Sequence, residues 1–324
     1  MESNYLTQGL TFAGAAPDLS ELHMAWFTYK DPDPGHSYNF AFDDDHKNIL
    51  DQGGNVTMST AYLGRGSGPV KETAMPYTAA GNVSTWGSDA TTESYVNGRK
   101  PRDFGSPAMK LRERYDLGDV DSSNRDLVKE MLMKHGAIQI SYWAGAGAYS
   151  PEGNGTYAYF NNYSTYTNHA VCIVGWDDTY SKTNFANQPT TDGAWLVRNS
   201  WGEDWGNEGY FYMSYEQYIA RATVFIVGKE NPNEKYYGYD DLGYINSYRY
   251  TNYPTIGYAA NVFQAEGNEY VKSVGFFTTD NNVQYEIYIF NDLGTSKPTC
   301  PVILDQLAPS TITSGTQTYA GYLA

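Results

Sequence analysis

The 324-residue sequence predicts an α+β domain followed by a β-sandwich domain. Segments with helical spacing of apolar residues come before Gly136, and short segments rich in β-branched and aromatic residues come after it. Helices that precede strands in this way are typical of an α+β domain. A polar stretch, residues 229–241, then separates these segments from further strand-like patterns. The predicted organisation is therefore a first domain over 1–228, a linker over 229–241 and a second domain over 242–324.

Three helices are predicted in the first domain. Asp18 to Glu21 fit a capping box, with an acceptor at the N-cap and a carboxylate three residues later. A short helix is predicted after Gly53-Gly54. A longer helix is predicted from Asn124 to His135, with basic residues in its last turn and Gly136 as its stop signal.

Strands are predicted from short runs of β-branched and aromatic residues. Those of the first domain are Ala137–Tyr142, Ala170–Trp176, Gly193–Asn199, Gly209–Ser214 and Ala222–Val227. Those of the second domain lie near Gly257–Phe263, Tyr270–Phe277 and Tyr285–Asn291. Alternation of polar and apolar residues from Tyr285 to Phe290 favours a sandwich-type β domain.

Composition excludes several classes of partner. The formal net charge of −16 argues against nucleic acid and against anionic membranes, which both select basic surfaces. No run approaches the roughly 20 apolar residues of a membrane span. Met1 to Asn4 lack the basic and apolar stretches of a signal peptide. Two cysteines, Cys172 and Cys300, form neither a disulfide framework nor a zinc pattern.

Two segments carry the chemical signal. One runs from Asn168 to Trp176 and begins with His169; the other runs from Gly193 to Gly202 and contains Asn199. Each places one polar residue at the end of an apolar strand, and antiparallel pairing could bring the two side chains together. A histidine held by an amide has a fixed tautomer and a directed ring, which a general base serving a thiol requires.

These segments resemble the histidine and asparagine motifs of the papain family of cysteine peptidases. Gly53-Gly54 resembles the paired glycines that line the family's substrate cleft, and Met75 to Tyr77 resembles its Tyr-Pro-Tyr stretch. The resemblance covers residues 1–228 and implies a papain-like fold with a helical half and a β half. From about residue 240 the sequence is similar to the lectin-like β domain that follows the peptidase in some large bacterial exported members.

The resemblance implies a role for each matched residue. His169 would form an ion pair with the thiolate and protonate the leaving amine, and Asn199 would hold the imidazole ring. Trp201 would shield that hydrogen bond from water, while Gly53 and Gly54 would offer backbone groups to an extended peptide. The implied partners are a peptide or protein substrate and a glycan or cell-surface ligand for the second domain. No metal or cofactor is implied, and the expected location is secreted or at the cell surface.

The nucleophilic cysteine is missing from the expected pattern. Glu2 to Asn4 match the far end of the helix that this cysteine should open, so we expect the thiol upstream of Met1. Cys172 is three residues from His169 on one strand, and odd separations place side chains on opposite faces. We therefore interpret Cys172 as a buried structural residue, and Cys300 lies beyond the linker. The chain is expected to be truncated at both ends and, as given, inactive.

Two hypotheses remain open. In the first, the chain is part of a cysteine endopeptidase; in the second, it is a non-catalytic binding protein with a dead peptidase fold. The intact His169 and Asn199 pair favours the first. The other histidines are interpreted as surface or capping residues, namely His23, His36, His46 and His135. Asp43 to His46 are predicted to be a solvated acidic loop rather than a metal site.

Overall fold

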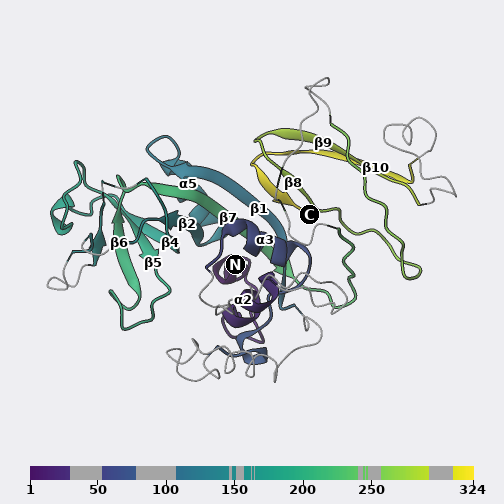
Figure 1. Ribbon diagram of the computed structural model, residues 1–324, viewed down its shortest axis with the longest axis horizontal. Coiled ribbons are helices and arrows are strands. Elements are labelled where there is room, and N and C mark those ends of the chain that lie inside the picture. The colour runs from purple at the N-terminus through teal and green to yellow at the C-terminus, as the bar shows by residue number, and fades with distance from the viewer. Residues whose placement is uncertain are drawn as a thin grey trace, which may run out of the picture.

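The computed structural model describes residues 1–29, 53–77, 107–145, 148–150, 157–161, 163, 165–239, 244, 246, 257–291 and 309–324. Within these ranges, nine strands form one sheet in the order β3-β6-β5-β4-β2-β7-β1-β11-β8 (Figure 1). Only the pair of β3 and β6 is parallel. The strands are β1 (Met109–Val120), β2 (Ile138–Tyr142), β3 (Ala158–Tyr159), β4 (His169–Asp177), β5 (Ala194–Arg198), β6 (Tyr210–Ser214), β7 (Ile219–Lys229), β8 (Phe276–Thr278) and β11 (Gly321–Leu323).

The β half of the first domain agrees with the sequence prediction. The five predicted strands correspond to β2, β4, β5, β6 and β7. β2 shows why they could be found: Ile138, Ile140 and Tyr142 are buried, and the residues between them are partly exposed. The buried faces of these strands form one apolar core. Helix α5 (Arg125–His135) covers this core with Val128 and other apolar residues. It corresponds to the helix predicted from Asn124 to His135.

The helical half has a core of its own. Helices α1 (Glu2–Thr7), α2 (Glu21–Tyr29) and α3 (Val56–Gly64) lie beside the middle of the sheet, near the N-terminus (Figure 1). Two 3-10 turns complete the described helical elements, η2 (Glu72–Ala74) and η5 (Lys182–Asn184). Leu22, Tyr62 and Leu63 pack with Met109 and Leu111 of β1. This second core joins the helices to the sheet.

Two details of α2 differ from the prediction. Its N-cap is Ser20, whose Oγ accepts a hydrogen bond from the backbone N–H of His23 at 3.0 Å. The backbone carbonyl of Asp18 instead accepts from Glu72. His23 is only 1% exposed, so its interpretation as a surface or capping residue is wrong. Its Nδ1 lies 2.6 Å from the Tyr62 hydroxyl, which satisfies the ring inside an apolar cluster.

Strand β1 was not predicted from the sequence. Its residues Lys110 and Arg114 are charged yet buried, because each has partners from distant segments. Lys110 Nζ lies 2.7 Å from Glu234, and Arg114 bonds to Asp116 and to the Thr60 hydroxyl. Charge pairs that form only in the folded chain leave no apolar alternation in the sequence, so the usual strand signal was absent.

The C-terminal region joins the same sheet. β11 pairs with β1 on one side and with β8 on the other, so Tyr322 lies between Arg114 and Phe277. A separate two-stranded sheet pairs β9 (Val283–Ile289) with β10 (Thr311–Gln317). β9 matches the alternation found in the sequence. The strand predicted near Gly257–Phe263 is absent from the described residues, and only the end of the one near Tyr270–Phe277 is present, as β8.

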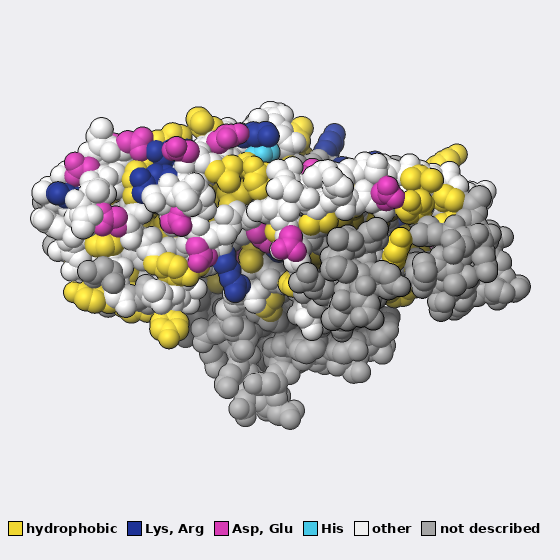
Figure 2. Space-filling model, turned by 90° about the horizontal axis from the view of Figure 1, so that it is seen from above, with side chains coloured by type: hydrophobic (Ala, Val, Ile, Leu, Met, Phe, Trp, Pro, Cys, Tyr) yellow, Lys and Arg dark blue, Asp and Glu magenta, His cyan; other side chains and the backbone are white. Residues whose placement is uncertain are grey.

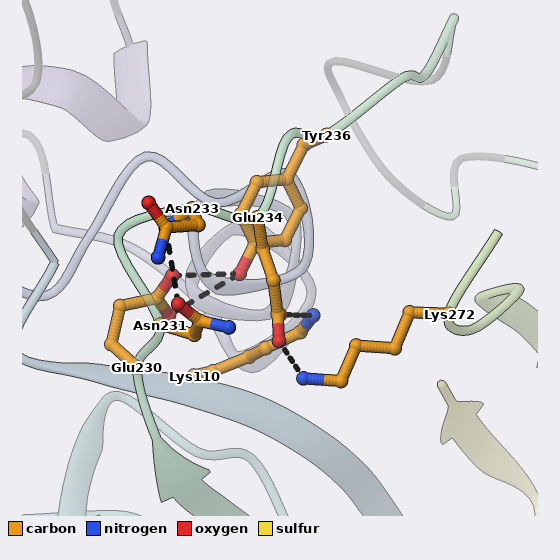
Figure 3. Close-up of polar contacts among 7 residues, drawn as sticks. All are labelled: Lys110, Glu230, Asn231, Asn233, Glu234, Tyr236 and Lys272. Carbon is orange, nitrogen blue, oxygen red and sulfur yellow. Dashed lines mark hydrogen bonds and ion pairs between the residues drawn. The ribbon is translucent and has the colours of Figure 1, made fainter. Parts of the chain in front are cut away.

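The predicted linker begins with an anchored turn. The Asn233 N–H donates to the Asn231 side chain, and Glu234 accepts from both Lys110 and Lys272 (Figure 3). Lys110 also lies 4.8 Å from the centre of the Tyr236 ring. These contacts tie residues 230–236 to β1 on one side and to the C-terminal region on the other. The predicted domain boundaries remain a prediction.

Some sequence expectations concern residues outside the described ranges. These are His36, the acidic run Asp43 to His46, and Cys300. Among the helices that the structure describes, none has the length and apolar character needed to cross a bilayer.

Candidate functional site

His169 is the first residue of β4, opposite Tyr142 at the end of β2. The segment that leads into it is held in place by Asn168. The Asn168 N–H donates to the Tyr142 carbonyl at 3.0 Å, and its side-chain oxygen accepts from the Ala144 N–H at 2.6 Å. Two hydrogen bonds to the end of β2 therefore hold the residue that directly precedes His169.

Asn199 directly follows β5 and is buried. Its Oδ1 lies 2.8 Å from His169 Nε2 and also accepts from the Ser200 N–H at 2.8 Å. The Ser200 N–H requires an acceptor, so it sets the orientation of the Asn199 amide. A carbonyl oxygen can only accept, and His169 Nε2 must therefore carry the proton. In the neutral ring, Nδ1 is then the atom with a free lone pair.

Trp201 covers this pair. Its ring stacks on the His169 imidazole, with centroids 4.9 Å apart and an interplanar angle of 26°. Trp205 meets Trp201 edge-on at 5.0 Å and Tyr149 edge-on at 5.4 Å. One face of the Trp201 ring therefore covers the histidine. The rest of its surface reaches solvent, since the side chain is 47% exposed. The predicted proximity of His169, Asn199 and Trp201 is present in the structure.

Glycines shape the loop that carries Trp201. Gly206 has φ +67°, and a Cβ there would lie 2.6 Å from the Tyr210 carbonyl oxygen. Gly209 has φ +84°, and a Cβ there would lie 3.0 Å from the Arg198 guanidinium. The positive φ at both positions disfavours other residues, and at Gly206 the backbone contact leaves no room for a Cβ. The glycines therefore let the loop fold back tightly after Asn199.

Trp205 and Tyr149 pack with Trp201 in one aromatic cluster beside His169. The sequence did not single them out as supporting residues, because their contacts join separate segments.

Gly53 and Gly54 lie at the other predicted part of the site. They are exposed and directly precede Asn55, the N-cap of α3, whose side chain accepts from the Met58 N–H at 3.0 Å. Gly53 has φ +68°, a conformation that glycine adopts readily. Their part in binding a peptide remains a prediction.

Cys172 lies on the strand face opposite His169. Its cross-strand neighbours are Gln139 on β2 and Arg198 on β5. The residue is partly exposed rather than fully buried in the apolar core, which corrects that part of the prediction. Burial raises the pKa of the Cys172 thiol. Cys172 is the only cysteine within the described ranges, so the structure brings no thiol of these residues to His169.

Charges on the face of the molecule shown in Figure 2 are mixed. Lys and Arg side chains lie scattered among Asp and Glu side chains there, rather than in a continuous basic patch.

His135, at the end of α5, is half-buried, and burial together with the neighbouring Lys134 lowers its pKa.

Two family models match the chain. Residues 44–226 match the papain family cysteine protease, and residues 236–324 match a lectin like domain. Testin-2 of Rattus norvegicus is 31% identical over 174 residues, which cover 52% of this chain and 46% of that protein. The chain spans less than half the length of the curated relatives it matches.

Two solved structures cover nearly the whole chain. One is the clostridial cysteine protease Cwp84 after propeptide cleavage, at 24% identity and a TM-score of 0.69, covering 100% of this chain and 71% of that one. The other contains the cysteine protease and lectin-like domains of Cwp84, a surface layer associated protein of Clostridium difficile. It is 24% identical with a TM-score of 0.67, covering 99% of this chain and 63% of that one. At this identity the likeness establishes a shared fold.

Proposed function

Because the chain belongs to the papain family of cysteine proteases, we propose that it carries the histidine and asparagine of a peptidase that hydrolyses peptide bonds. The single observation that supports this best is the 2.8 Å contact between His169 Nε2 and Asn199 Oδ1 under the Trp201 ring. The contact leaves Nδ1 of the neutral ring free to take a proton from a thiol.

The proposed reaction follows from that geometry. His169 Nδ1 takes the thiol proton, and the resulting thiolate attacks the scissile carbonyl carbon. When the C–N bond breaks, His169 returns the proton to the leaving amine, and a thioester joins the acyl group to the enzyme. His169 then removes a proton from water, which hydrolyses the thioester and regenerates the thiol. Asn199 keeps the ring aimed throughout, and Trp201 limits the access of water to their hydrogen bond.

The proposal assigns the thiol to a segment outside these 324 residues. Cys172 faces away from His169 within the described ranges, which argues against it as the nucleophile. In the same proposal, Gly53 and Gly54 offer backbone groups to an extended peptide substrate. The chain alone is then inactive, and a longer protein that supplies a cysteine is active. Hydrolysis of a fluorogenic peptide by both forms, with His169→Ala as a variant of the longer one, tests this assignment.

A second role concerns the C-terminal region. Its match to a lectin like domain supports the proposal that residues 236–324 bind a glycan or another cell-surface ligand. The solved relative described as surface layer associated supports a secreted or cell-surface location. If a longer protein with its cysteine in place is also inactive, a non-catalytic binding protein becomes the better description of the whole. Binding of the chain to insoluble cell-wall polysaccharide tests the glycan part directly.

A further inference from the structure

A cavity of about 160 Å³ lies where the C-terminal region joins the sheet. Arg114 and Asp116 of β1 form one side, and Phe277, Thr278 and Thr279 form the other. Tyr244 and Ala320 complete the lining. Both regions of the chain therefore contribute walls, and nothing in the proposed peptidase chemistry uses these residues.

The sheet register explains why a hollow forms here. The Asp116 N–H donates to the Ala320 carbonyl at 2.8 Å, directly before β11 begins. β11 then lies between β1 and β8, with Gly321 paired to both Tyr115 and Thr278. Ala320 lines the cavity with a short side chain, which leaves space between the larger residues of β1 and β8. Gly321 adds no space, because the Arg114 backbone occupies the position that its Cβ would take.

The polar wall is an ion pair with no net charge. Arg114 is buried and bonds to Asp116, and its other guanidinium nitrogen donates to Thr60 Oγ1 at 3.0 Å. The side chain of Asp116 is about one-third exposed, so its oxygens can accept further hydrogen bonds. Arg114 Nε and Thr278 Oγ1 have no hydrogen-bond partner among the described residues. Both atoms are buried with almost no accessible surface, so the group of this ion pair that a ligand can reach is the partly exposed Asp116 carboxylate.

The other wall is aromatic. The Phe277 and Tyr244 rings lie 6.1 Å apart with an interplanar angle of 36°. The Arg114 guanidinium lies 5.9 Å from the centre of the Phe277 ring. The lining of this cavity therefore combines aromatic side chains with hydrogen-bonding groups.

We propose that this cavity binds one ring of a neutral saccharide. An engineered cavity of about 150 Å³ holds one benzene molecule, so the volume suits a single six-membered ring and is too small for a peptide. A sugar presents C–H groups to aromatic faces and hydroxyls to carboxylates and threonines. Asp116 already neutralises Arg114, which disfavours anionic ligands. This inference rests on the proposed glycan binding of the C-terminal region and deepens it by naming the site.

The test uses the full chain and free sugars. Glucose, galactose, mannose and N-acetylglucosamine are titrated and followed by saturation-transfer difference NMR, with glucuronate as the charged comparison. Thr279 is exposed at the rim, so Thr279→Phe should block the cavity without disturbing the fold. Tyr244→Leu removes one aromatic wall. Thr313→Phe is the matched control, because Thr313 is exposed on β10 and does not line the cavity.

At least one neutral sugar should bind saturably, with glucuronate at least tenfold weaker. Both cavity variants should weaken that binding at least tenfold, and Thr313→Phe should leave it unchanged. Equal binding by Thr279→Phe and the unaltered chain would overturn the cavity as the site while leaving glycan binding intact. Binding to cell-wall polysaccharide without binding to any free sugar would have the same meaning. Failure to bind either would overturn the cavity and the proposed glycan binding together, and neither result bears on peptidase activity.

Discussion

The imidazole Nε2 of His169 and the amide Oδ1 of Asn199 lie 2.8 Å apart, although the two residues are 30 positions apart in the sequence. Two adjacent strands bring them together, since β4 begins at His169 and its antiparallel neighbour β5 ends just before Asn199. The contact fixes which ring nitrogen carries the proton. It can therefore be examined without any enzymatic assay.

Replacing Asn199 with Ala should remove the tautomer preference of His169. In the unaltered chain, long-range ¹H–¹⁵N NMR should show the neutral ring protonated on Nε2, because Oδ1 can only accept. In Asn199→Ala the two neutral tautomers should both be populated. Asn168→Ala is the control, since its side chain bonds to Ala144 rather than to the imidazole. An unchanged spectrum for Asn199→Ala would contradict the assigned hydrogen bond.

The chain by itself should show no measurable peptide hydrolysis. Loss of the nucleophile in a comparable serine enzyme costs on the order of 10⁶ in turnover, because the reacting residues act as a unit. Hydrolysis of a fluorogenic peptide is followed with and without a thiol-directed inhibitor. In a longer protein that supplies the cysteine, His169→Ala should also lower turnover by about 10⁶, because the histidine and the nucleophile act as a unit. Inhibitor-sensitive turnover by the present chain would instead identify Cys172 or Cys300 as the nucleophile.

Cys172 should react slowly with alkylating reagents. Burial raises the pKa of its thiol. The thiolate is the reactive form, so alkylation by iodoacetamide at neutral pH should be slower in the native chain than in urea. The measurement uses Cys300→Ser so that mass spectrometry reports one thiol. Faster labelling in the native chain than in urea would reopen a chemical role for Cys172.

Glu216 should stabilise the fold in a pH-dependent way. Burial disfavours its ionised form. Four hydrogen bonds of 2.6–2.9 Å from Thr190 and Thr191 outweigh that effect and lower its pKa to about 2. A carboxyl whose pKa falls on folding stabilises the protein above its unfolded pKa, near 4.5, and loses this contribution as the pH drops toward 2. Allowing for solvent screening, Glu216→Gln should cost about 1–2 kcal/mol at pH 7.

Urea unfolding at pH 7 and near pH 2 measures this difference. The difference in free energy of unfolding between Glu216→Gln and the unaltered chain should shrink as the pH falls. Glu203→Gln is the control, because its side chain is highly exposed and lies 4.0 Å from its only cationic neighbour in the described part of the chain. An equal difference in free energy of unfolding at both pH values would show that the charge of the Glu216 carboxylate does not cause the stabilisation.

Removal of the Glu234 carboxylate should destabilise the chain strongly. Glu234 neutralises Lys110, and both side chains are less than a tenth exposed. Breaking a buried pair leaves an unpaired charge, which typically costs about 3–5 kcal/mol. Glu234→Leu should therefore lower the free energy of unfolding by about this amount. Adding Lys110→Met should recover part of the loss, because it removes the stranded charge.

A matched comparison is available nearby. Lys235 bridges Glu266 and Glu269 at the surface, and Lys235→Gln should change the free energy of unfolding little, because exposed ion pairs are screened by solvent. If Glu234→Leu had as small an effect as Lys235→Gln, or if Lys110→Met gave no recovery, the ion pair in Figure 3 would not be the main anchor of this turn.

Sequence patterns predicted the parts of the fold whose signals are local. β2 and α5 were predictable because apolar residues recur at spacings of two or near 3.6. β1 was missed because Lys110 and Arg114 occupy buried positions, with partners that are distant in sequence. His23 was misassigned for the same reason, since its partner Tyr62 lies 39 residues away.

The candidate site followed a similar division. The family motif contained His169, Asn199 and Trp201. The aromatic cluster beside them also needs Tyr149, which comes from a separate segment and packs on Trp201 and Trp205. The pairing of β11 with β1 has no sequence signal at all, because three residues are too few to show a period.

That pairing has a consequence for the order in which the chain can fold. β7 and β11 occupy opposite edges of β1, and about 90 residues separate them in the sequence. At a synthesis rate of about 5–20 residues per second, the outer edge of β1 stays unpaired for roughly 5–20 s after β7 has been made. During that interval the nascent first domain exposes a row of free backbone donors and acceptors, a surface on which chaperones and neighbouring chains can compete with its own last strand.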